Sequence, residues 1–219
     1  MATPYFQLRR ERVPSTQDVA RTTIEDLPVL VLATGQTAGR GRSGSEWLTA
    51  DRALAASLAF HHERDEDRPL SLMAGLAAVR ATSNATLKWP NDVMVGEAKV
   101  GGILVERSED ITTVGLGLNL WWPDAPDGMG ASHLEDPGPR AHAEIGALWG
   151  AELMEMLDDT DWPMEAYRAV CVTLGRDITW EPDGAGRAVD IAPDGALVVE
   201  TPSGREAIHS GVVRHVRQS

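Results

Sequence analysis

The sequence predicts an α+β fold in which a mixed sheet is flanked by helices and followed by a small β-barrel. Three observations support this. Short apolar runs of strand length are separated by polar breaks through the first half of the chain. Longer segments carry apolar residues at helical spacing. After Gly175 the apolar runs are short and are separated by turn pairs, which is typical of a barrel of about five strands.

The first part of the chain predicts strands, a helix and then a meander. Residues 27–34 form a short apolar, β-branched run that stops at Gly35, and residues 54–60 form the next apolar run. Residues 70–83 have apolar side chains at helical spacing, which indicates a helix packed on the sheet. A turn at 88–91 is followed by three predicted antiparallel strands, at residues 92–95, 100–106 and 112–119.

The second part predicts a loop, two helices and the barrel. Residues 121–139 are rich in Pro, Gly and Asp and favour a long surface loop. Helical spacing recurs in residues 142–157 and 163–174, and Gly175 is a suitable helix C-cap. We therefore predict two domains, residues 1–174 and residues 175–219.

Composition argues against several classes of protein. The formal net charge of −13 disfavours a nucleic-acid partner, because such binding needs a basic surface. The single cysteine, Cys171, allows neither a disulfide nor a cysteine-rich zinc site, and we expect a buried structural thiol in the last helix. No apolar run approaches the roughly 18 residues of a membrane span. A cytoplasmic protein is expected.

A cationic glycine-rich loop occupies residues 39–44, Gly-Arg-Gly-Arg-Ser-Gly. It fits the G-x-G-x-x-G pattern of dinucleotide-binding proteins, but residues 45–52 leave too little chain for the helix that such a fold needs. Arg40 and Arg42 instead offer charged side chains to a carboxylate or phosphate. A solvated basic turn is the ordinary alternative. The sequence thus favours a small anionic ligand.

Two further motifs follow. Lys88-Trp-Pro-Asn-Asp92 combines a cation, a rigid ring and two polar side chains able to hold a phosphate or its magnesium. Lys99 stands just before Gly101 and Gly102, where a backbone can approach a ligand closely. Taken alone, each motif is also compatible with a surface lysine beside a turn or a strand.

Taken in order, the motifs resemble the biotin–protein ligase family. They are Gly-Arg-Gly-Arg-x-Gly-x-x-Trp, Lys-Trp-Pro-Asn-Asp, Lys-x-x-Gly-Ile-Leu-x-Glu and Gly-x-Gly-x-Asn, at residues 39–47, 88–92, 99–106 and 115–119. Ser15-Thr16 resembles the family's biotin-contacting pair, and the tail is similar to its SH3-like barrel. The resemblance covers nearly the whole chain. It implies a class II aminoacyl-tRNA synthetase-like catalytic domain.

The resemblance implies that ATP adenylates biotin, with magnesium, and that biotin passes to a lysine of a biotin carboxyl carrier protein domain. Ser15, Thr16 and Gln36 are expected to bind the ureido ring of biotin, while Gly39 and Arg40 close over it. Lys99 is the expected catalytic residue, assisted by Arg40. The biotin-site residues also include Lys99, Gly101 and Gly102. The expected nucleotide-binding residues are Arg42, Trp47, Lys88, Asn91, Asp92 and Asn119. No metal ligands are assigned.

Two departures and three alternatives accompany this interpretation. Ser45 stands where the family often has arginine, and Gln17 where asparagine is frequent. A lipoate–protein ligase and a non-catalytic biotin-binding module are the rival functions. Many relatives also carry a winged helix for DNA, which needs some 60 residues ahead of Ser15. Because these residues are absent from the sequence, we expect no DNA binding. Members of the family form homodimers through a sheet edge.

Overall fold

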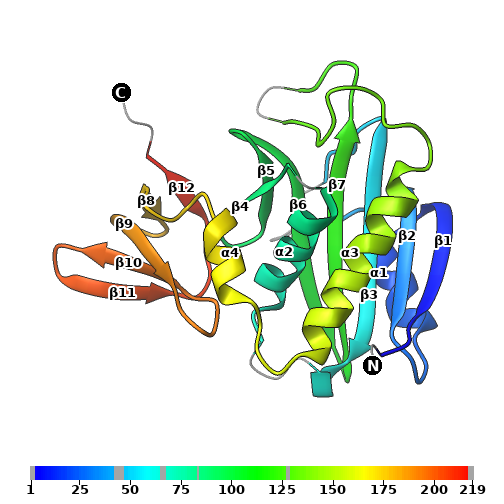
Figure 1. Cartoon of the computed structure of the whole chain (residues 1–219), viewed down its shortest axis with the longest axis horizontal. Coiled ribbons are helices and arrows are strands. Elements are labelled where there is room, and N and C mark those ends of the chain that lie inside the picture. The colour runs from blue at the N-terminus through cyan, green and yellow to red at the C-terminus, as the bar shows by residue number, and fades with distance from the viewer. Residues whose placement is uncertain (1–2, 42–46, 65–67, 83, 127–128, 217–219) are drawn as a thin grey trace.

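The computed structural model describes residues 3–41, 47–64, 68–82, 84–126 and 129–216. Its larger sheet is mixed, because β1 and β2 are parallel and the other neighbouring strands are antiparallel. In sheet order the strands are β1 (Phe6–Val13), β2 (Val29–Gln36), β3 (Arg52–His61), β7 (Ile111–Trp121), β6 (Ala98–Ser108), β5 (Asp92–Val95) and β4 (Thr86–Lys88). The predicted α+β class and the β5–β6–β7 meander are confirmed (Figure 1).

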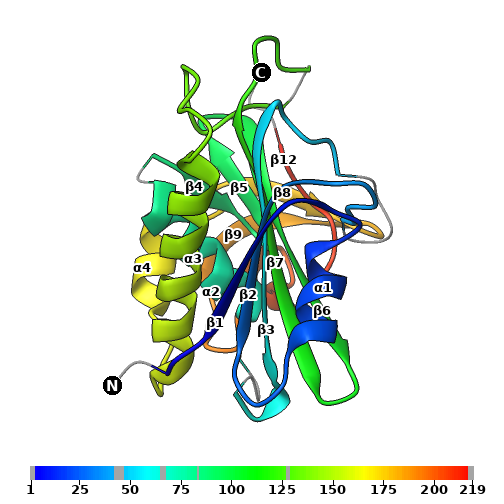
Figure 2. The same ribbon diagram turned by 90° about the vertical axis from the view of Figure 1, so that its right-hand side faces the viewer.

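Helices cover the sheet unequally. α2 (Leu70–Thr82) and α3 (Ala141–Asp158) pack on one face, and the short α1 (Thr16–Thr23) lies on the other (Figure 2). The α3 backbone approaches the sheet closely, since a Cβ on Gly150 would stand 2.4 Å from Leu30 Cδ2. The main core therefore lies under α2 and α3, and the α1 face is left partly open for a site.

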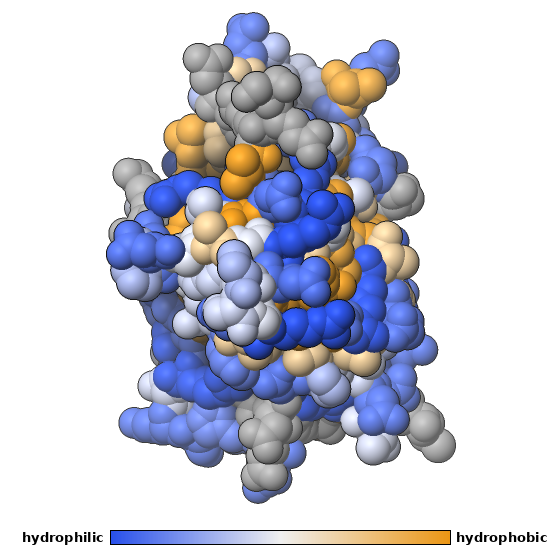
Figure 3. All heavy atoms as spheres, turned by 90° about the vertical axis from the view of Figure 1, so that its left-hand side faces the viewer, coloured by the Kyte–Doolittle hydropathy of each residue, from blue (hydrophilic) through white to orange (hydrophobic). Residues whose placement is uncertain are grey.

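The C-terminal part begins after α4 (Met164–Val170) and forms a second, antiparallel sheet. Its strands are β8 (Asp177–Trp180), β9 (Gly184–Ile191), β10 (Leu197–Thr201), β11 (Gly204–Ile208) and β12 (Val213–His215). Their order, β11-β10-β9-β8-β12, confirms the five predicted strands, and within the described residues the row is not closed into a ring. The face that it presents is mainly hydrophilic, with separate apolar patches (Figure 3).

Several elements differ from the prediction, among them the short strand β4, which precedes the expected turn at 88–91 and was not predicted. The edge strand β1 and helix α1 were missed, because β1 is rich in arginine and α1 buries only three of its residues. The last helix ends at Val170 instead of residue 174. Cys171 leaves the helix to form a parallel bridge with Leu87, and the next amide, Val172 N, donates to Leu87 O at 2.8 Å. The domain boundary at residues 174 and 175 stays a prediction.

Among the described residues, no helix is both long enough and apolar enough to cross a membrane. A short 3₁₀ turn, η2 (His62–Arg64), follows β3.

The packing of α3 can be tested at two neighbouring residues. Trp149 is fully buried and its Nε1 donates to Ala74 O at 3.0 Å, whereas Leu148 is 55% exposed. We expect Trp149→Ala to lower the free energy of unfolding by about 3–5 kcal/mol. Leu148→Ala, the matched control, is expected to stay within about 0.5 kcal/mol of the parent. Urea unfolding followed by circular dichroism measures both, and equal losses would contradict this packing.

Candidate active site

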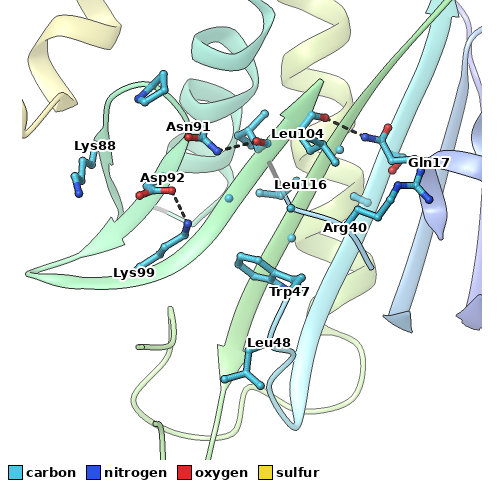
Figure 4. A pocket seen from close by; sticks show the side chains of 18 of the residues that line it. Gln17, Arg40, Trp47, Leu48, Lys88, Asn91, Asp92, Lys99, Leu104 and Leu116 are labelled. Atoms are coloured by element: carbon cyan, nitrogen blue, oxygen red, sulfur yellow. Dashed lines mark hydrogen bonds and ion pairs between the residues drawn. The ribbon is translucent and has the colours of Figure 1, made fainter. Parts of the chain in front are cut away.

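A cavity of about 620 Å³ lies on the sheet face that carries α1 (Figure 4). Its walls come from the start of α1, the end of β2, the inner strands of the large sheet, the β4–β5 turn and the segment before β12. Ten of the predicted site residues line it: Ser15, Thr16, Gln36, Arg40, Trp47, Lys88, Asn91, Asp92, Lys99 and Gly102. A volume of this order suits a small-molecule ligand.

One end of the cavity is polar and is organised by Thr16. Thr16 N and Oγ1 donate to Gln36 Oε1 at 2.7 and 3.0 Å, and Oγ1 also lies 2.8 Å from Ser57 Oγ. Since these donors hold the Gln36 carbonyl oxygen, its Nε2 is turned toward Gly39, where a Cβ would be only 3.0 Å away. Among the described residues the amide nitrogen of Gln36 makes no hydrogen bond, so it remains available as a donor.

Gln17 and Ser15 add buried polar groups at the same end. Gln17 Nε2 donates to Leu104 O at 3.1 Å, and its buried Oε1 has no hydrogen-bond partner among the described residues. Ser15 is 2% exposed and its hydroxyl does not cap α1. Unpaired buried polar groups are costly, so this end is suited to a ligand that offers both donors and acceptors.

A β-bulge brings Lys99 into the cavity. The pairing of β5 with β6 shifts by one residue at Met94, which pairs with Lys99. Val100 is the extra residue, and its side chain is fully buried in the core. Lys99 therefore lies on the same face as Gly102, where a Cβ would stand 3.8 Å from Lys99 Cε. Without the bulge, strand alternation would point Lys99 to the opposite face.

The ammonium group of Lys99 has two neighbours. Its Nζ forms an ion pair with Asp92 Oδ1 at 2.6 Å and lies 6.0 Å from the centroid of the Trp47 ring. Lys88, at the end of β4, lines the same end of the cavity. The sequence contains two lysines, and both are cavity residues.

Two glycines form the floor beneath Trp47. Gly102 on β6 pairs with Gly117 on β7. A Cβ on Gly117 would lie 2.9 Å from Trp47 Cε2, and one on Gly102 would lie 3.4 Å from Cζ3. The missing side chains thus leave a flat surface for the indole ring. This places an aromatic plane between the two ends of the cavity (Figure 4).

The turn between β4 and β5 is anchored on both sides. Trp89 N donates to Thr173 Oγ1 and Trp89 Nε1 to Gly195 O, both at 3.0 Å, which ties the turn to the C-terminal part. On the sheet side, Asn91 Nδ2 donates to Ile103 O at 3.0 Å. The charged ends of the turn therefore face the cavity from a fixed backbone.

Three predicted residues do not line the cavity. Gly101 faces the core, because a Cβ there would lie 2.9 Å from Gly117 O. It was predicted to approach a ligand, but it is not among the residues that line the cavity. Asn119 is buried, with Oδ1 accepting from Ala50 N at 2.9 Å and Nδ2 donating to Leu48 O. It fixes the chain that follows Trp47 and does not line the cavity.

Gly39 lies just behind Gln36 and supports its amide group rather than the cavity wall. Arg42, which was expected to bind nucleotide, and Ser45 lie outside the described residues. Their contributions stay predictions.

Arg40 reaches the cavity wall, but its guanidinium contacts two carboxylates. Nη1 and Nη2 each lie 2.9 Å from an oxygen of Asp18, and Nη2 lies 3.0 Å from Glu106 Oε2. The hydrogen bond from Arg40 lowers the pKa of Asp18, and the two carboxylates raise the pKa of Arg40. Asp18 and Arg40 are therefore both charged at neutral pH. The expected role of Arg40 in holding a ligand anion stays a prediction.

A metal site built wholly from protein is not present in the described residues, which contain no group of three or more His, Cys, Asp or Glu able to share an ion. Asp92 and Asn91 together offer the kind of oxygen ligands that Mg²⁺ takes when it also binds substrate phosphates. The site therefore fits magnesium held partly by a nucleotide.

Several cavity residues were missed from the sequence. Ser57 could have been found, because it is the one polar residue in the apolar run of β3. Asp18 and Glu106 do not line the cavity but contact Arg40, and these contacts could not be found because they join a helix and a strand to a distant loop residue. Met129, Glu181, the two residues before β12 and its first residue, Val213, also line the cavity and belong to segments that were expected to be loop or barrel.

Two family models match the chain. The biotin/lipoate A/B protein ligase family matches residues 10–120, and the biotin protein ligase C-terminal domain matches residues 173–216. The first match falls on the large sheet, and the second falls on the C-terminal sheet.

Individual relatives agree. A biotin--[acetyl-CoA-carboxylase] ligase of Paracoccus denitrificans is 31% identical over an alignment covering 84% of this chain and 88% of that protein. Its counterpart in Mycobacterium tuberculosis is 29% identical, covering 86% and 79%. The solved biotin protein ligase from Aquifex aeolicus in complex with biotin and ATP is 25% identical, covers 97% of this chain and 99% of that chain, and has a TM-score of 0.82.

The buried thiol provides a test of which groups the site uses. Cys171 is 6% exposed, and burial raises the pKa of its thiol. We expect the native chain to resist a thiol-reactive dye at pH 8 and to react only after unfolding, because the thiolate is the reactive form. Cys171→Ala should keep the parent activity. Rapid labelling of the native chain, with loss of activity, would show that the thiol belongs to the site.

Proposed function

Because the chain belongs to the biotin/lipoate A/B protein ligase family, we propose that it is a biotin–protein ligase. It activates the carboxylate of biotin with ATP and transfers biotin to a lysine of a carrier domain of a carboxylase. One observation carries this proposal: a single cavity holds both a buried polar end and, across the Trp47 ring, a lysine for anionic groups.

The polar end favours biotin over lipoate. Biotin's ureido ring has two N–H donors and a carbonyl acceptor, whereas the dithiolane ring of lipoate has none. The Gln36 amide nitrogen can donate to the carbonyl, and the Ser15 hydroxyl, which does not cap α1, can accept an N–H. With lipoate these buried groups would stay unpaired, and a site built for hydrogen bonding strongly rejects a ligand that lacks them.

At the other end of the cavity, Lys99 stabilises the negative charge that develops as biotin is adenylated. In the first step a biotin carboxylate oxygen attacks the α-phosphorus of ATP, the bond to the β-phosphate bridging oxygen breaks, and pyrophosphate leaves. Lys99 Nζ, held by Asp92 at 2.6 Å, lies where it can neutralise the carboxylate and the α-phosphate oxygens together. In the second step the carrier amine attacks the acyl carbon and AMP leaves.

Magnesium bound with ATP would neutralise the phosphates. Asp92 and Asn91 are the residues that would hold it. The bulge at Val100 fixes Lys99 on the cavity side, so the amine needs no rearrangement to reach a bound ligand.

Other properties of this enzyme are further proposals. Absence of DNA binding rests on the net charge of −13, and a cytoplasmic site of action on the single buried cysteine. A homodimer would use an edge of the large sheet, as in the family that the sequence resembles, and the edge strands are β1 and β4.

Carrier labelling tests the proposed function. We expect the purified chain, incubated with ATP, magnesium, biotin and an apo carrier domain, to give a band that streptavidin detects. Excess lipoate should not reduce it, because lipoate cannot satisfy the polar end of the cavity. Pyrophosphate exchange stimulated by lipoate and not by biotin would reverse the choice. Biotin binding without exchange would indicate a non-catalytic module.

Removal of the lysine tests the catalytic assignment. Lys99→Ala is expected to lower the rate of adenylation by about 10²–10³, the usual effect of losing one group that stabilises transition-state charge. Thermal unfolding should change little, since Lys99 is 35% exposed. Arg80→Ala, which removes a basic side chain paired with Glu152 far from the cavity, is the control. Parent-like adenylation by Lys99→Ala would refute the assignment.

A further inference from the structure

The guanidinium of Arg40 has its hydrogen-bonding capacity largely occupied. Nη1 and Nη2 form a two-point contact with Asp18, at 2.9 Å each, and Nη2 and Nε face Glu106 at 3.0 and 3.4 Å. Every nitrogen of the fork therefore has a carboxylate partner. An arginine bound in this way is poorly placed to bind a ligand anion as well.

Arg21 joins the same group of charges. Its Nη2 contacts Asp18 Oδ1 and lies 4.0 Å from Glu106 Oε2. The four side chains carry two positive and two negative charges, so the group has no net charge with which to attract an anion. Figure 4 shows Arg40 beside Gln17, at the opposite end of the cavity from Lys99 and Asp92.

The backbone around Arg40 is held at two places. Thr37 N and Ala38 N donate to Val13 O and Pro14 O, at 3.0 and 2.9 Å, which fixes the start of the segment. Beyond Ala38 the Arg40 backbone lies in an isolated β-bridge, and the Arg40 side chain adds an attachment to Asp18 and Glu106. Arg40 and Gly41 line the cavity beside the residues of its polar end.

We infer that Asp18 and Glu106 are positioning residues: through Arg40 they fasten the Gly39–Gly41 backbone against the polar end of the cavity and so retain biotin. This inference rests on the proposed function, because it assigns that end to biotin. Asp18 comes from α1 and Glu106 from β6, so the contact joins the loop to both walls of the pocket.

The contact is strong enough to affect ligand retention. An isolated surface ion pair contributes little, but a two-point arginine contact within a network is the exception. Asp18 and Glu106 side chains are 47% and 27% exposed, so solvent weakens each pair, and about 1 kcal/mol for removal of one partner is a suitable scale. That energy corresponds to about a fivefold change in a dissociation rate.

The test compares Asp18→Asn and Glu106→Gln with the parent, using radiolabelled biotin chased with unlabelled biotin. Both variants are expected to release biotin about three to ten times faster, while the KM for ATP and the maximal rate of pyrophosphate exchange stay at parent values. A residue needed only for folding would not separate biotin release from these two parameters.

The matched control is Glu152→Gln, which breaks the Arg80–Glu152 pair at 2.9 Å, with similar exposure but between α2 and α3. It should leave biotin release unchanged.

Arg40→Lys distinguishes a positioning role of Arg40 from direct binding of a ligand anion. A positioning role predicts faster biotin release, as in Glu106→Gln, because lysine cannot contact both carboxylates. Binding of a ligand anion predicts that lysine preserves retention and that Arg40→Gln lowers the maximal exchange rate.

Parent-like biotin release in both carboxylate variants would overturn the inference, and so would a fall in the maximal exchange rate equal to the gain in release. If one variant fails to fold, as judged by circular dichroism, the other decides. The proposed function fails separately, when the parent chain itself labels no carrier. A parent that labels carrier, with variants that retain biotin normally, would refute the positioning role alone.

Discussion

A β-bulge one residue wide determines which side of the large sheet carries the amine of Lys99. Val100 takes the place in the core that regular alternation would give to its neighbours, and Lys99 is turned to the cavity, 2.6 Å from Asp92. The floor of paired glycines and the indole above it are arranged around this amine. Bulges commonly re-aim a side chain beside an active site, and here the geometry of the reaction follows from one.

The cavity divides its charges between two ends. At one end a lysine faces a single carboxylate, and this cation can turn to a ligand anion when one arrives. At the other end two arginines pair with two carboxylates, and Arg40 holds its loop against the neighbouring helix and strand. An acidic chain can in this way concentrate attraction for carboxylate and phosphate at one point without a generally basic surface.

Much of this could be predicted from the sequence, for identifiable reasons. Strand and helix periodicity located the meander and α2 closely, because their side chains meet a buried core. Edge strand β1 escaped notice, since an exposed strand needs no apolar pattern. The ordered motifs predicted most of the polar residues that line the cavity. The partners of Arg40 and the orientation of Gly101 could not be predicted, because they depend on pairings between distant segments. Periodicity contains no information about such pairings.

The placement of both lysines inside the cavity has a chemical consequence for the rest of the surface. An acyl-adenylate reacts with unprotonated primary amines, and the basic side chains elsewhere on this chain are histidines and arginines, which carry no primary amine. An activated intermediate that escaped into solvent would therefore meet no side-chain amine on the outer surface of the protein that made it. Amine-directed reagents would for the same reason report on the cavity alone among the side chains.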